Sequence, residues 1–316
     1  MDEVQEPAAW PSGRQLSIGD GQTRATVTEV GAGLRELEIA GEAVLWPYPV
    51  GEMASGGRGQ VLAPWPNRVE DGTYTFGTVS AQAPLDEPDR RNAIHGLVRW
   101  LKWDVDEQGK RSVALSCLLA PQPAYPWRLR LGIRYEVLDG GLVVHASATN
   151  ESPMAAPYGM GLHPYLDAGP GGVDGCTLTL AADRRLVLDE RGIPQGSAEV
   201  AGTTYDFAGG GSLTGVRLDD CFTGLSGPAG HVLPAGAAWE AVLSSGSGRR
   251  SGLWADGAWG YVMVYTGDTL APDEQRRGVA IEPMTCPPNA FRSGQSVVTL
   301  APGGRWEGRF GIRLVD

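Results

Sequence analysis

Apolar and polar residues alternate over long stretches of this chain, and this pattern limits its fold more than any other feature. In LRLGIRYEVLDGGLVVHASATN, residues 129–150, every second side chain is apolar on both sides of the turn DGG. Such an alternation predicts a β-hairpin with one buried face. Similar patterns occur in the segments RSVALSCLLA, CTLTLAADRRLVLDERG, AWEAVLSS, GYVMVYTGD and SVVTLAPGGRWEGRFGIRL.

Long helices are not expected, because no stretch keeps a 3.6-residue apolar period for three or four turns. The 46 glycines and 23 prolines fall between the strand-like segments, and we interpret them as turns. Many short strands spaced by about 8–12 residues indicate a large antiparallel sandwich or barrel. We find no internal repeat or linker and expect one all-β domain over residues 1–316, with residues 1–12 as a loose N-terminal extension.

The charge and the termini exclude several classes of partner. A formal net charge of −11 argues against a nucleic-acid partner, since surfaces that bind phosphates gather Lys and Arg. The segment MDEVQEPAAWPSG lacks the apolar core of a secretory signal, and no apolar run has the length of a membrane span. The four cysteines have no spacing typical of a zinc site, a redox motif or a disulfide framework. We expect a cytoplasmic protein with a small neutral ligand and no membrane partner.

Two segments combine hydrogen-bonding side chains with a stiff backbone. In APWPNRVEDGTYTF, residues 63–76, prolines flank Trp65, and Asn67 and Arg68 follow. Donors beside an indole suit the hydroxyl groups of a sugar, whereas the alternative is a rigid loop with Arg68 in an ordinary salt bridge. In VRLDDCFTGL, an extended backbone would point Asp219 and Asp220 to opposite sides, so at most one of them faces a given pocket.

Histidine is rare in this chain, and two of the four histidines stand where a loop meets apolar residues. These are His95 in NAIHGLVRW and His163 in GLHPYL. Imidazole exchanges protons near neutral pH, which suits a catalytic group, but a hydrogen-bonded structural role is the alternative. His145 lies within an alternating strand and His231 within a Gly/Pro-rich segment, and we assign neither a role.

One carboxylate stands at the end of an apolar run. Glu282 follows Val279-Ala280-Ile281 in GVAIEPMTCPPNAF. A buried carboxylate needs a partner, so Glu282 either pairs with an arginine such as Arg68 or is a catalytic base with a raised pKa. We find no metal-ligand spacing, no GxGxxG, no P-loop and no GxSxG, and expect neither a metal nor a cofactor.

Five segments in this order resemble the aldose 1-epimerase (galactose mutarotase) family, in its divergent bacterial branch: PNRVEDGTYTF, NAIHGLVRW, GLHPYL, LDDCF and IEPMTCPPNAF. The resemblance implies a galactose-mutarotase-like β-supersandwich of large antiparallel sheets, with the sugar in a cleft on one curved sheet. It also implies roles for single residues. Glu282 matches the catalytic base and His163 the catalytic acid, while the positions that match substrate-binding residues are His95, Arg68, Asp219 and, beside Arg68, Asn67.

The implied reaction interconverts the α and β anomers of a free aldohexose such as glucose or galactose. We expect Glu282 to be ionised and His163 protonated in the resting enzyme, with Asp219 raising the histidine pKa and Arg68 lowering that of a nearby carboxylate. GLHPYL differs from the N-H-x-Y-F-N context of the galactose-specific branch, which leaves the preferred sugar open. A sister branch acts on hexose 6-phosphates, and the cations near enough in sequence for such a substrate are Arg90, Arg91, Arg99 and Lys102.

Two further alternatives stay open at this stage. A glycoside hydrolase could use Glu282 and Asp219 as its two carboxylates. A sugar-binding protein without catalysis could stack Trp65, Trp100 and Trp103 on sugar rings. The expected partner is in each case a small sugar, and the chain is expected to be a monomer or a homodimer.

Overall fold

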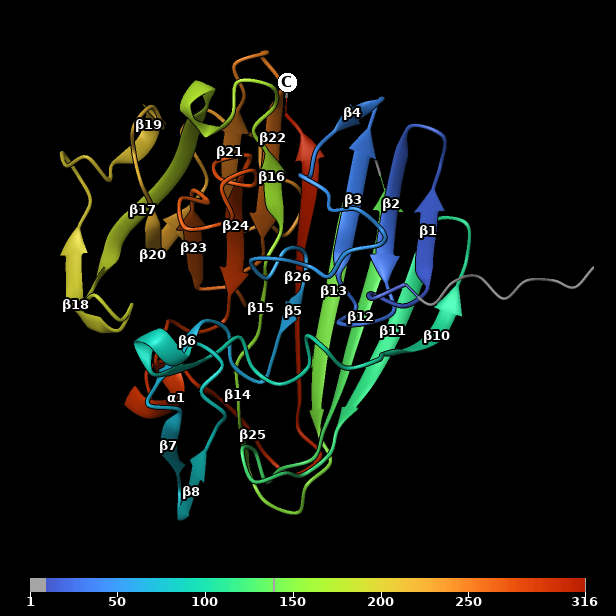
Figure 1. Ribbon diagram of the computed structural model, residues 1–316, viewed down its shortest axis with the longest axis vertical. Helices are drawn as coiled ribbons and strands as arrows, with labels where there is room; N and C mark the ends of the chain where they lie inside the picture. Colours follow the sequence, from blue (N-terminus) through green and yellow to red (C-terminus); the bar gives the residue numbers. More distant parts are fainter. Residues whose placement is uncertain (1–9, 139, 316) are drawn as a thin grey trace, which may run out of the picture.

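The computed structural model describes residues 10–138 and 140–315. Of the expected N-terminal extension, residues 1–9 lie outside the described residues, whereas Ser12 is buried and accepts a hydrogen bond from Val30 N. The described chain consists largely of antiparallel strands, which confirms the predicted all-β fold (Figure 1). Its helical segments are short, namely α1 (Ala290–Ser293), η1 (Pro88–Arg90) and η2 (Val173–Gly175).

One large antiparallel sheet runs through most of the molecule. Its strands follow the order β10 (Asp104–Gln108), β11 (Ser112–Leu119), β12 (Leu129–Leu138), β13 (Gly141–Asn150), β26 (Arg305–Leu314), β22 (Arg250–Ala255), β21 (Trp239–Ser244), β17 (Thr177–Leu188), β20 (Asp219–Ser226), β23 (Tyr261–Tyr265), β24 (Gly278–Met284), β15 (Gly161–Leu162) and β5 (Val61–Leu62). Outside this order, β16 (Tyr165–Asp167) pairs with β24, and β18 (Pro194–Glu199) and β19 (Phe207–Ser212) pair with β17.

The hairpin predicted over residues 129–150 is formed by β12 and β13. Leu129 lies opposite Asn150, and Leu138 lies opposite Gly141. The apolar residues at alternate positions of both strands are buried, as the period-two pattern requires. Each of the other five alternating segments also contains a strand.

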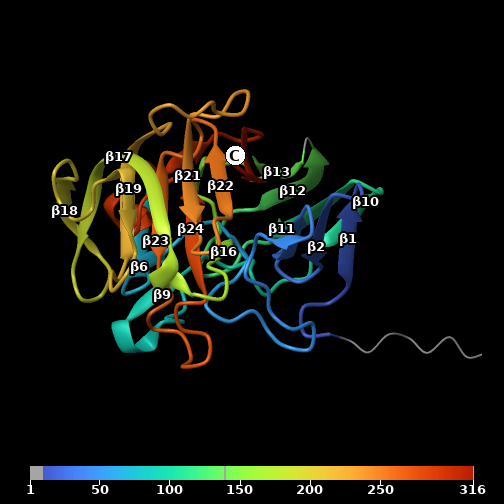
Figure 2. The same ribbon diagram turned by 90° about the horizontal axis from the view of Figure 1, so that it is seen from above.

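A second sheet covers one end of the large sheet. It has the order β1 (Gln15–Gly19), β2 (Thr23–Thr28), β3 (Leu34–Ile39) and β4 (Glu42–Ala43), and Figures 1 and 2 show it over β10–β13. Leu16 and Val27 of this sheet belong to the same buried core as Leu131 and Tyr135. Burial of one such side chain contributes about 1.5–3 kcal/mol. The hydroxyl of Tyr135 is satisfied within the core, because it donates to the carbonyl oxygen of Ala32 at 2.6 Å.

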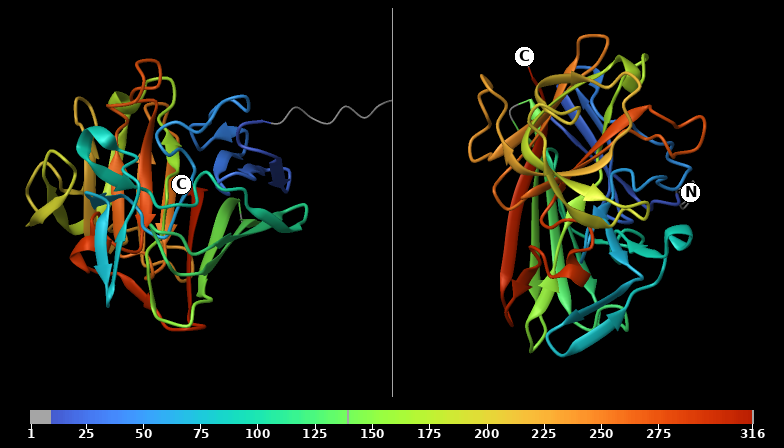
Figure 3. Two further views of the ribbon diagram at one scale, coloured as in Figure 1. Left: turned by 60° about the horizontal axis from the view of Figure 1, so that its bottom comes forward. Right: turned by 90° about the vertical axis from the view of Figure 1, so that its left-hand side faces the viewer.

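Three small strand pairs lie at the other end of the molecule. They are β6 (Arg68–Glu70) with β9 (Asn92–Ile94), β7 (Thr73–Phe76) with β8 (Val79–Gln82), and β14 (Ala156–Tyr158) with β25 (Val298–Leu300). Figure 3 shows the segment around β6 and η1, in cyan, against the orange strands of the large sheet. Among the described residues, no helix has the length and apolar character needed to cross a membrane.

Candidate active site

A cavity of about 500 Å³ lies where the segment around β6 and η1 meets the large sheet. Its walls come from parts of the chain that are far apart in sequence, from Ala54 to Glu282. All six residues singled out in the sequence line it, namely Asn67, Arg68, His95, His163, Asp219 and Glu282. The structure therefore brings together every predicted site residue, although their roles remain predictions.

The register of β24 places His163 opposite Glu282. Gly161 of β15 pairs with Met284, and Tyr165 of β16 pairs with Ala280. His163 and Pro164 lie in the gap between these two short strands, and continuing the register sets His163 against Glu282. Proline has no N–H for the ladder, but its carbonyl oxygen accepts from Ile281 N at 3.1 Å, so the interrupted strand stays attached to β24.

Glu282 and His163 form a buried pair with 3.2 Å between Oε1 and Nε2. Their side chains are only 2% and 5% exposed. Burial raises the pKa of Glu282 well above its usual range; Asp219 raises it further and Arg68 lowers it. Burial lowers the pKa of His163 to about 3. Because low polarity disfavours both charged forms, the pair keeps one proton, and burial favours that proton on Glu282.

The expected charges of this pair are thus wrong for the site without ligand. Neither an ionised Glu282 nor a protonated His163 is favoured, since desolvation is the largest influence on the pKa of each residue and disfavours its charged form. Asp219 acts on Glu282, whose pKa it raises, and not on the histidine as expected. Arg68 does lower the carboxylate pKa, as expected, but its hydrogen-bonded partner is Glu87.

Aromatic and backbone groups hold the ring of His163 from several sides. Tyr165 stacks on it with 5.0 Å between centroids and 15° between planes, and His95 meets it edge-on at 5.3 Å. Gly57, at φ +74°, packs so closely that a Cβ there would lie 2.7 Å from Cδ2 of His163. These contacts leave the imidazole one orientation.

His95 is fixed in a single tautomer by Asn67. The backbone N–H of Asn67 donates to Nδ1 of His95 at 3.3 Å, so a neutral ring carries its proton on Nε2. Burial, with the nearby His163 and arginines, lowers the pKa of His95 well below its usual value and keeps it neutral. Both residues have left-handed backbones, with φ of +53° and +63°, a conformation that costs about 1–3 kcal/mol per residue.

Arg68 uses two of its guanidinium nitrogens to bind a carboxylate that was not identified from the sequence. Its Nε and Nη2 donate to the two oxygens of Glu87 at 2.9 and 3.0 Å. Burial alone would raise the pKa of Glu87, but the hydrogen bonds and charge of Arg68 hold it below its usual value. Nη1 of Arg68 lies 3.6 Å from Asp219 Oδ2 without a hydrogen bond. Nothing in the sequence points to Glu87 except the general rule that a buried arginine needs an anionic partner.

Three fully buried polar atoms of the cavity residues have no hydrogen-bond partner within the described chain. They are Nη1 of Arg68, Nδ1 of His163 and Oε2 of Glu282. Buried polar atoms are nearly always paired. Three unpaired atoms beside one cavity are therefore what we expect where a ligand rich in hydroxyl groups binds. Among the described residues, no three His, Cys, Asp or Glu side chains are grouped so that they could hold a metal ion.

Asp220 and two of the three tryptophans singled out in the sequence fall outside the cavity. Asp220 faces away and pairs with Arg185 at 2.9 Å, as the alternation along an extended strand predicted. Trp65 and Trp103 are 1% and 0% exposed and belong to the core, so the expectation that they stack on a sugar is wrong. Trp100 is 46% exposed and lines the cavity.

Comparison with known families matches residues 14–313 to aldose 1-epimerase. This chain belongs to the aldose 1-epimerase family. It is 34% identical over 294 residues to the uncharacterized protein YihR of Escherichia coli K12. The aligned residues make up 92% of this chain and 90% of YihR. The resemblance noted in the five segments is therefore confirmed for the family as a whole.

Two solved structures of this family share the fold. The GalM/aldose epimerase homologue from Caenorhabditis elegans is 19% identical with a TM-score of 0.81, over 96% of this chain and 98% of that one. The galactose 1-epimerase from Lactobacillus acidophilus NCFM is 24% identical with a TM-score of 0.75, over 94% of this chain and 92% of that one. These likenesses confirm the expected galactose-mutarotase-like fold.

Proposed function

We propose that this chain is an aldose 1-epimerase that interconverts the α and β anomers of a free aldohexose such as glucose or galactose, without a cofactor. The observation that carries the proposal is the buried Glu282–His163 pair, which holds one proton beside a cavity with unpaired polar atoms. Mutarotation needs one group that takes a proton and one that gives a proton, and a pair with a single proton supplies both.

Ring opening follows from this pair. The roles proposed for the two residues require the proton of Glu282 to pass to His163 in the sugar complex. The charge of Arg68 lowers the Glu282 pKa and so acts against the burial that keeps the proton on Glu282 in the free site. Glu282 then takes the proton of the anomeric hydroxyl while His163 protonates the ring oxygen. The bond from C1 to the ring oxygen breaks, and O1 becomes the carbonyl oxygen of the open-chain aldose.

Reclosure uses the same groups in reverse. After rotation about the C1–C2 bond, His163 removes the proton from the ring hydroxyl, and Glu282 returns a proton to O1. The sugar then leaves as the other anomer, and the pair again holds one proton. Each positioned acid or base contributes about 10²–10⁴-fold to the rate.

The remaining cavity residues bind the sugar. The guanidinium of Arg68 and the Nε2–H of His95 donate to its hydroxyl groups, and the carboxylate of Asp219 accepts from one. Asn67 acts through its neighbours, since its backbone sets the tautomer of His95 and its side-chain oxygen accepts from Arg68 N at 2.9 Å.

Charge favours a neutral sugar over a hexose 6-phosphate. Five carboxylates and three arginines line the cavity. Arg99 is paired with Asp86 at 2.6 Å and Arg90 lies near Glu87, so their charges are already neutralised. Lys102 and Arg91, the other cations considered for a phosphate, pair with Glu29 and with Asp71 away from the cavity.

We also propose that the enzyme works in the cytoplasm and that one chain suffices for activity. The four cysteines are free and buried, which suits a reducing compartment. Residues of a single chain form the whole cavity wall described above.

The test is polarimetry on freshly dissolved α-D-glucose and α-D-galactose, with wild type, Glu282→Gln and Asp220→Asn. The matched control Asp220→Asn removes a neighbouring carboxylate that faces away from the cavity. We expect wild type and Asp220→Asn to exceed the buffer blank, and Glu282→Gln to lose at least about 100-fold in kcat. Sugar binding by calorimetry without acceleration of mutarotation would instead identify a non-catalytic sugar-binding protein.

A further inference from the structure

The turn between β17 and β18, residues 189–193, reaches across to the segment that carries Arg68. Asp189 organises this turn, because its Oδ1 accepts from the backbone N–H groups of Arg191 and Ile193, both at 2.9 Å. The backbone N–H of Gly192 donates to the carbonyl oxygen of Asp189 at 2.9 Å. The turn is therefore held by its own hydrogen bonds before it contacts the rest of the molecule.

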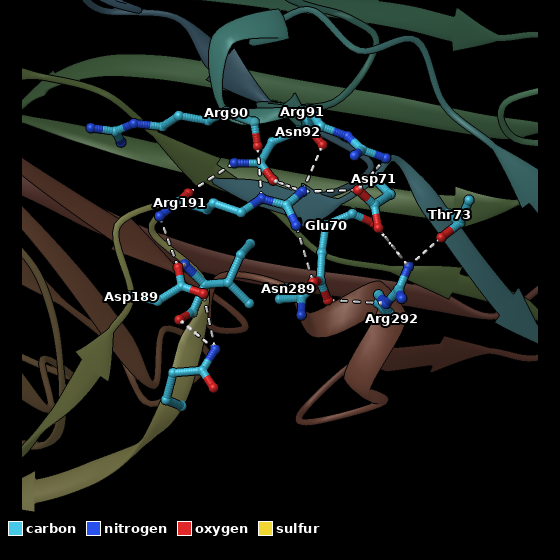
Figure 4. A network of polar contacts seen from close by, with 12 residues as sticks. Glu70, Asp71, Thr73, Arg90, Arg91, Asn92, Asp189, Arg191, Asn289 and Arg292 are labelled. Atoms are coloured by element: carbon cyan, nitrogen blue, oxygen red, sulfur yellow. Dashed lines mark hydrogen bonds and ion pairs between the residues drawn. The ribbon is translucent and has the colours of Figure 1, made fainter.

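The side chain of Arg191 attaches this turn to the segments around β6 and β9 through hydrogen bonds and ion pairs, as Figure 4 shows. Its Nε donates to the carbonyl oxygen of Arg90 at 2.9 Å, and its Nη2 donates to that of Arg91 at 3.0 Å. Its Nη1 and Nη2 also reach the carboxylates of Glu70 and Asp71 at 3.2 and 3.0 Å. A planar guanidinium with five donors can make all these contacts at once, which a lysine cannot.

Two contacts connect the fastened turn with Arg68. The side-chain amide of Asn92 donates to the carbonyl oxygen of Arg191 and to Glu87, both at 2.8 Å, and Glu87 holds Arg68. Gly192, at φ +75°, packs against the guanidinium itself. A Cβ at Gly192 would lie 2.6 Å from Nη1 and 2.9 Å from Cζ of Arg68.

We propose that Arg191 and Gly192 are positioning residues for sugar binding. Arg191 anchors the 189–193 turn, and the turn then holds Arg68 between Gly192 and Glu87, with Nη1 3.6 Å from Asp219 Oδ2. This inference rests on the proposed function, because it assigns Arg68 to the substrate. A guanidinium that is already in place binds without losing side-chain freedom, so loosening the turn affects substrate binding more than proton transfer.

The first experiment compares Gly192→Ala with Gly202→Ala in the polarimetric assay. Gly202 has nearly the same backbone, with φ +70°, but its added Cβ meets no atom within 4 Å. Both variants carry the same backbone strain, and only Gly192→Ala pushes on Arg68. We expect KM to rise by about 10-fold to 100-fold in Gly192→Ala, kcat to fall by less, and Gly202→Ala to match wild type. Equal effects of the two substitutions on KM overturn the proposal.

The second experiment compares Arg191→Ala with Arg292→Ala. Arg292 contacts the same carboxylates, Glu70 and Asp71, but no hydrogen bond connects it to Arg90, Asn92 or Gly192 in the described structure. We expect KM to rise in Arg191→Ala alone. If Arg191→Ala does not fold, Arg191→Lys replaces it, with the same expected direction. An unchanged KM in the folded Arg191 variant overturns the proposal.

A spectroscopic measurement separates this inference from the proposed function. In protein labelled with ¹⁵N-arginine, the Nε–H of Arg68 is expected to give a slowly exchanging signal, assigned by its loss in Arg68→Lys. The signal should exchange faster in Arg191→Ala and stay unchanged in Arg292→Ala, whether or not any hexose is a substrate. Unaltered exchange in Arg191→Ala overturns the positioning role, whereas lack of mutarotation by wild type counts only against the proposed function.

Discussion

Glu282 and His163 lie 3.2 Å apart in a buried site, and this proximity determines how the activity should depend on pH. The active pair holds one proton. A second proton enters only as pH falls through the pKa of His163, which burial lowers to about 3. The pair loses its proton only well above the usual range of a glutamate, because the pKa of Glu282 is raised. We expect kcat/KM to be level through neutral pH, with its acid limb near pH 3.

This profile is measured by polarimetry across pH, with the spontaneous mutarotation of each buffer subtracted. Since kcat/KM reports the free enzyme, it tests the pair as it stands without sugar. An acid limb near pH 6.5 would contradict the expectation, because it would give His163 the pKa of an ordinary solvated imidazole.

The same buried carboxyl should make the protein less stable at high pH than a variant that cannot ionise. The folded pKa of Glu282 is above its unfolded value, so its contribution is fully present below the unfolded pKa and is lost as pH rises through the folded pKa. The substitution Glu282→Gln removes this pH-dependent loss of stability, because glutamine does not ionise. We expect its stability relative to wild type to grow with pH above about 4.5, by up to about 1.4 kcal/mol per pH unit until the folded pKa is reached.

Urea unfolding of both proteins at several pH values from 5 to 8 measures this difference. Gln also places an N–H donor where Oε1 of Glu282 lies, 3.2 Å from Nε2 of His163, so the ring keeps a polar neighbour. A stability difference that stays constant over this pH range would show that Glu282 is ionised in the folded protein.

Residue types made His163, Glu282 and Arg68 candidates but left a structural role open for each, and the resemblance to the family decided between the two. Neither predicted the partners of these residues. Glu87 was missed, because it stands 19 residues after Arg68 without any pattern of its own. Stacking of Trp65 on a sugar belonged to the alternative of a sugar-binding protein, because aromatic residues in a Pro-rich loop look alike whether they face a ligand or, as here, the core.

At the scale of elements, long alternating segments were predictable and short strands were not. β12 and β13 bury alternate residues over ten positions each, which leaves a clear period in the sequence. β15 and β16 have two and three residues and no period to detect. Their register nevertheless sets His163 against Glu282, so the decisive geometry of the site depends on pairing that only the folded sheet defines.

The loop between β4 and β5 offers a test of how its backbone holds His163, the proposed catalytic acid. A Cβ at Gly57 would press on the ring of His163 at 2.7 Å. Displacing a catalytic group by about 1 Å can cost up to about 100-fold, so Gly57→Ala should lower kcat more than it raises KM. Gly202→Ala is again the control for strain, and a loss confined to KM would show that Gly57 contacts the sugar and does not position His163.

At the scale of the whole molecule, the cavity joins segments that the sequence keeps far apart. Arg68 comes from β6, His95 directly follows β9, Asp219 begins β20, and Glu282 lies in the interior of the large sheet. The all-β character was predictable from patterning, whereas the strand order was not, because any buried alternating strand can pair with any other. The order of the five family segments carried that information indirectly, through their resemblance to a known fold.

Because the cavity ties these segments together, a bound sugar should stabilise the whole molecule. A ligand at 100 times its Kd adds about 2.7 kcal/mol to the free energy of unfolding. We expect glucose or galactose to raise the melting temperature in a dose-dependent way and glucose 6-phosphate to raise it less, since carboxylates outnumber arginines around the cavity. Thermal unfolding with each sugar, and with Arg68→Lys as a control of weakened binding, measures the effect. Stronger stabilisation by the phosphorylated sugar, lost in Arg68→Lys, would assign the cavity to anionic hexoses.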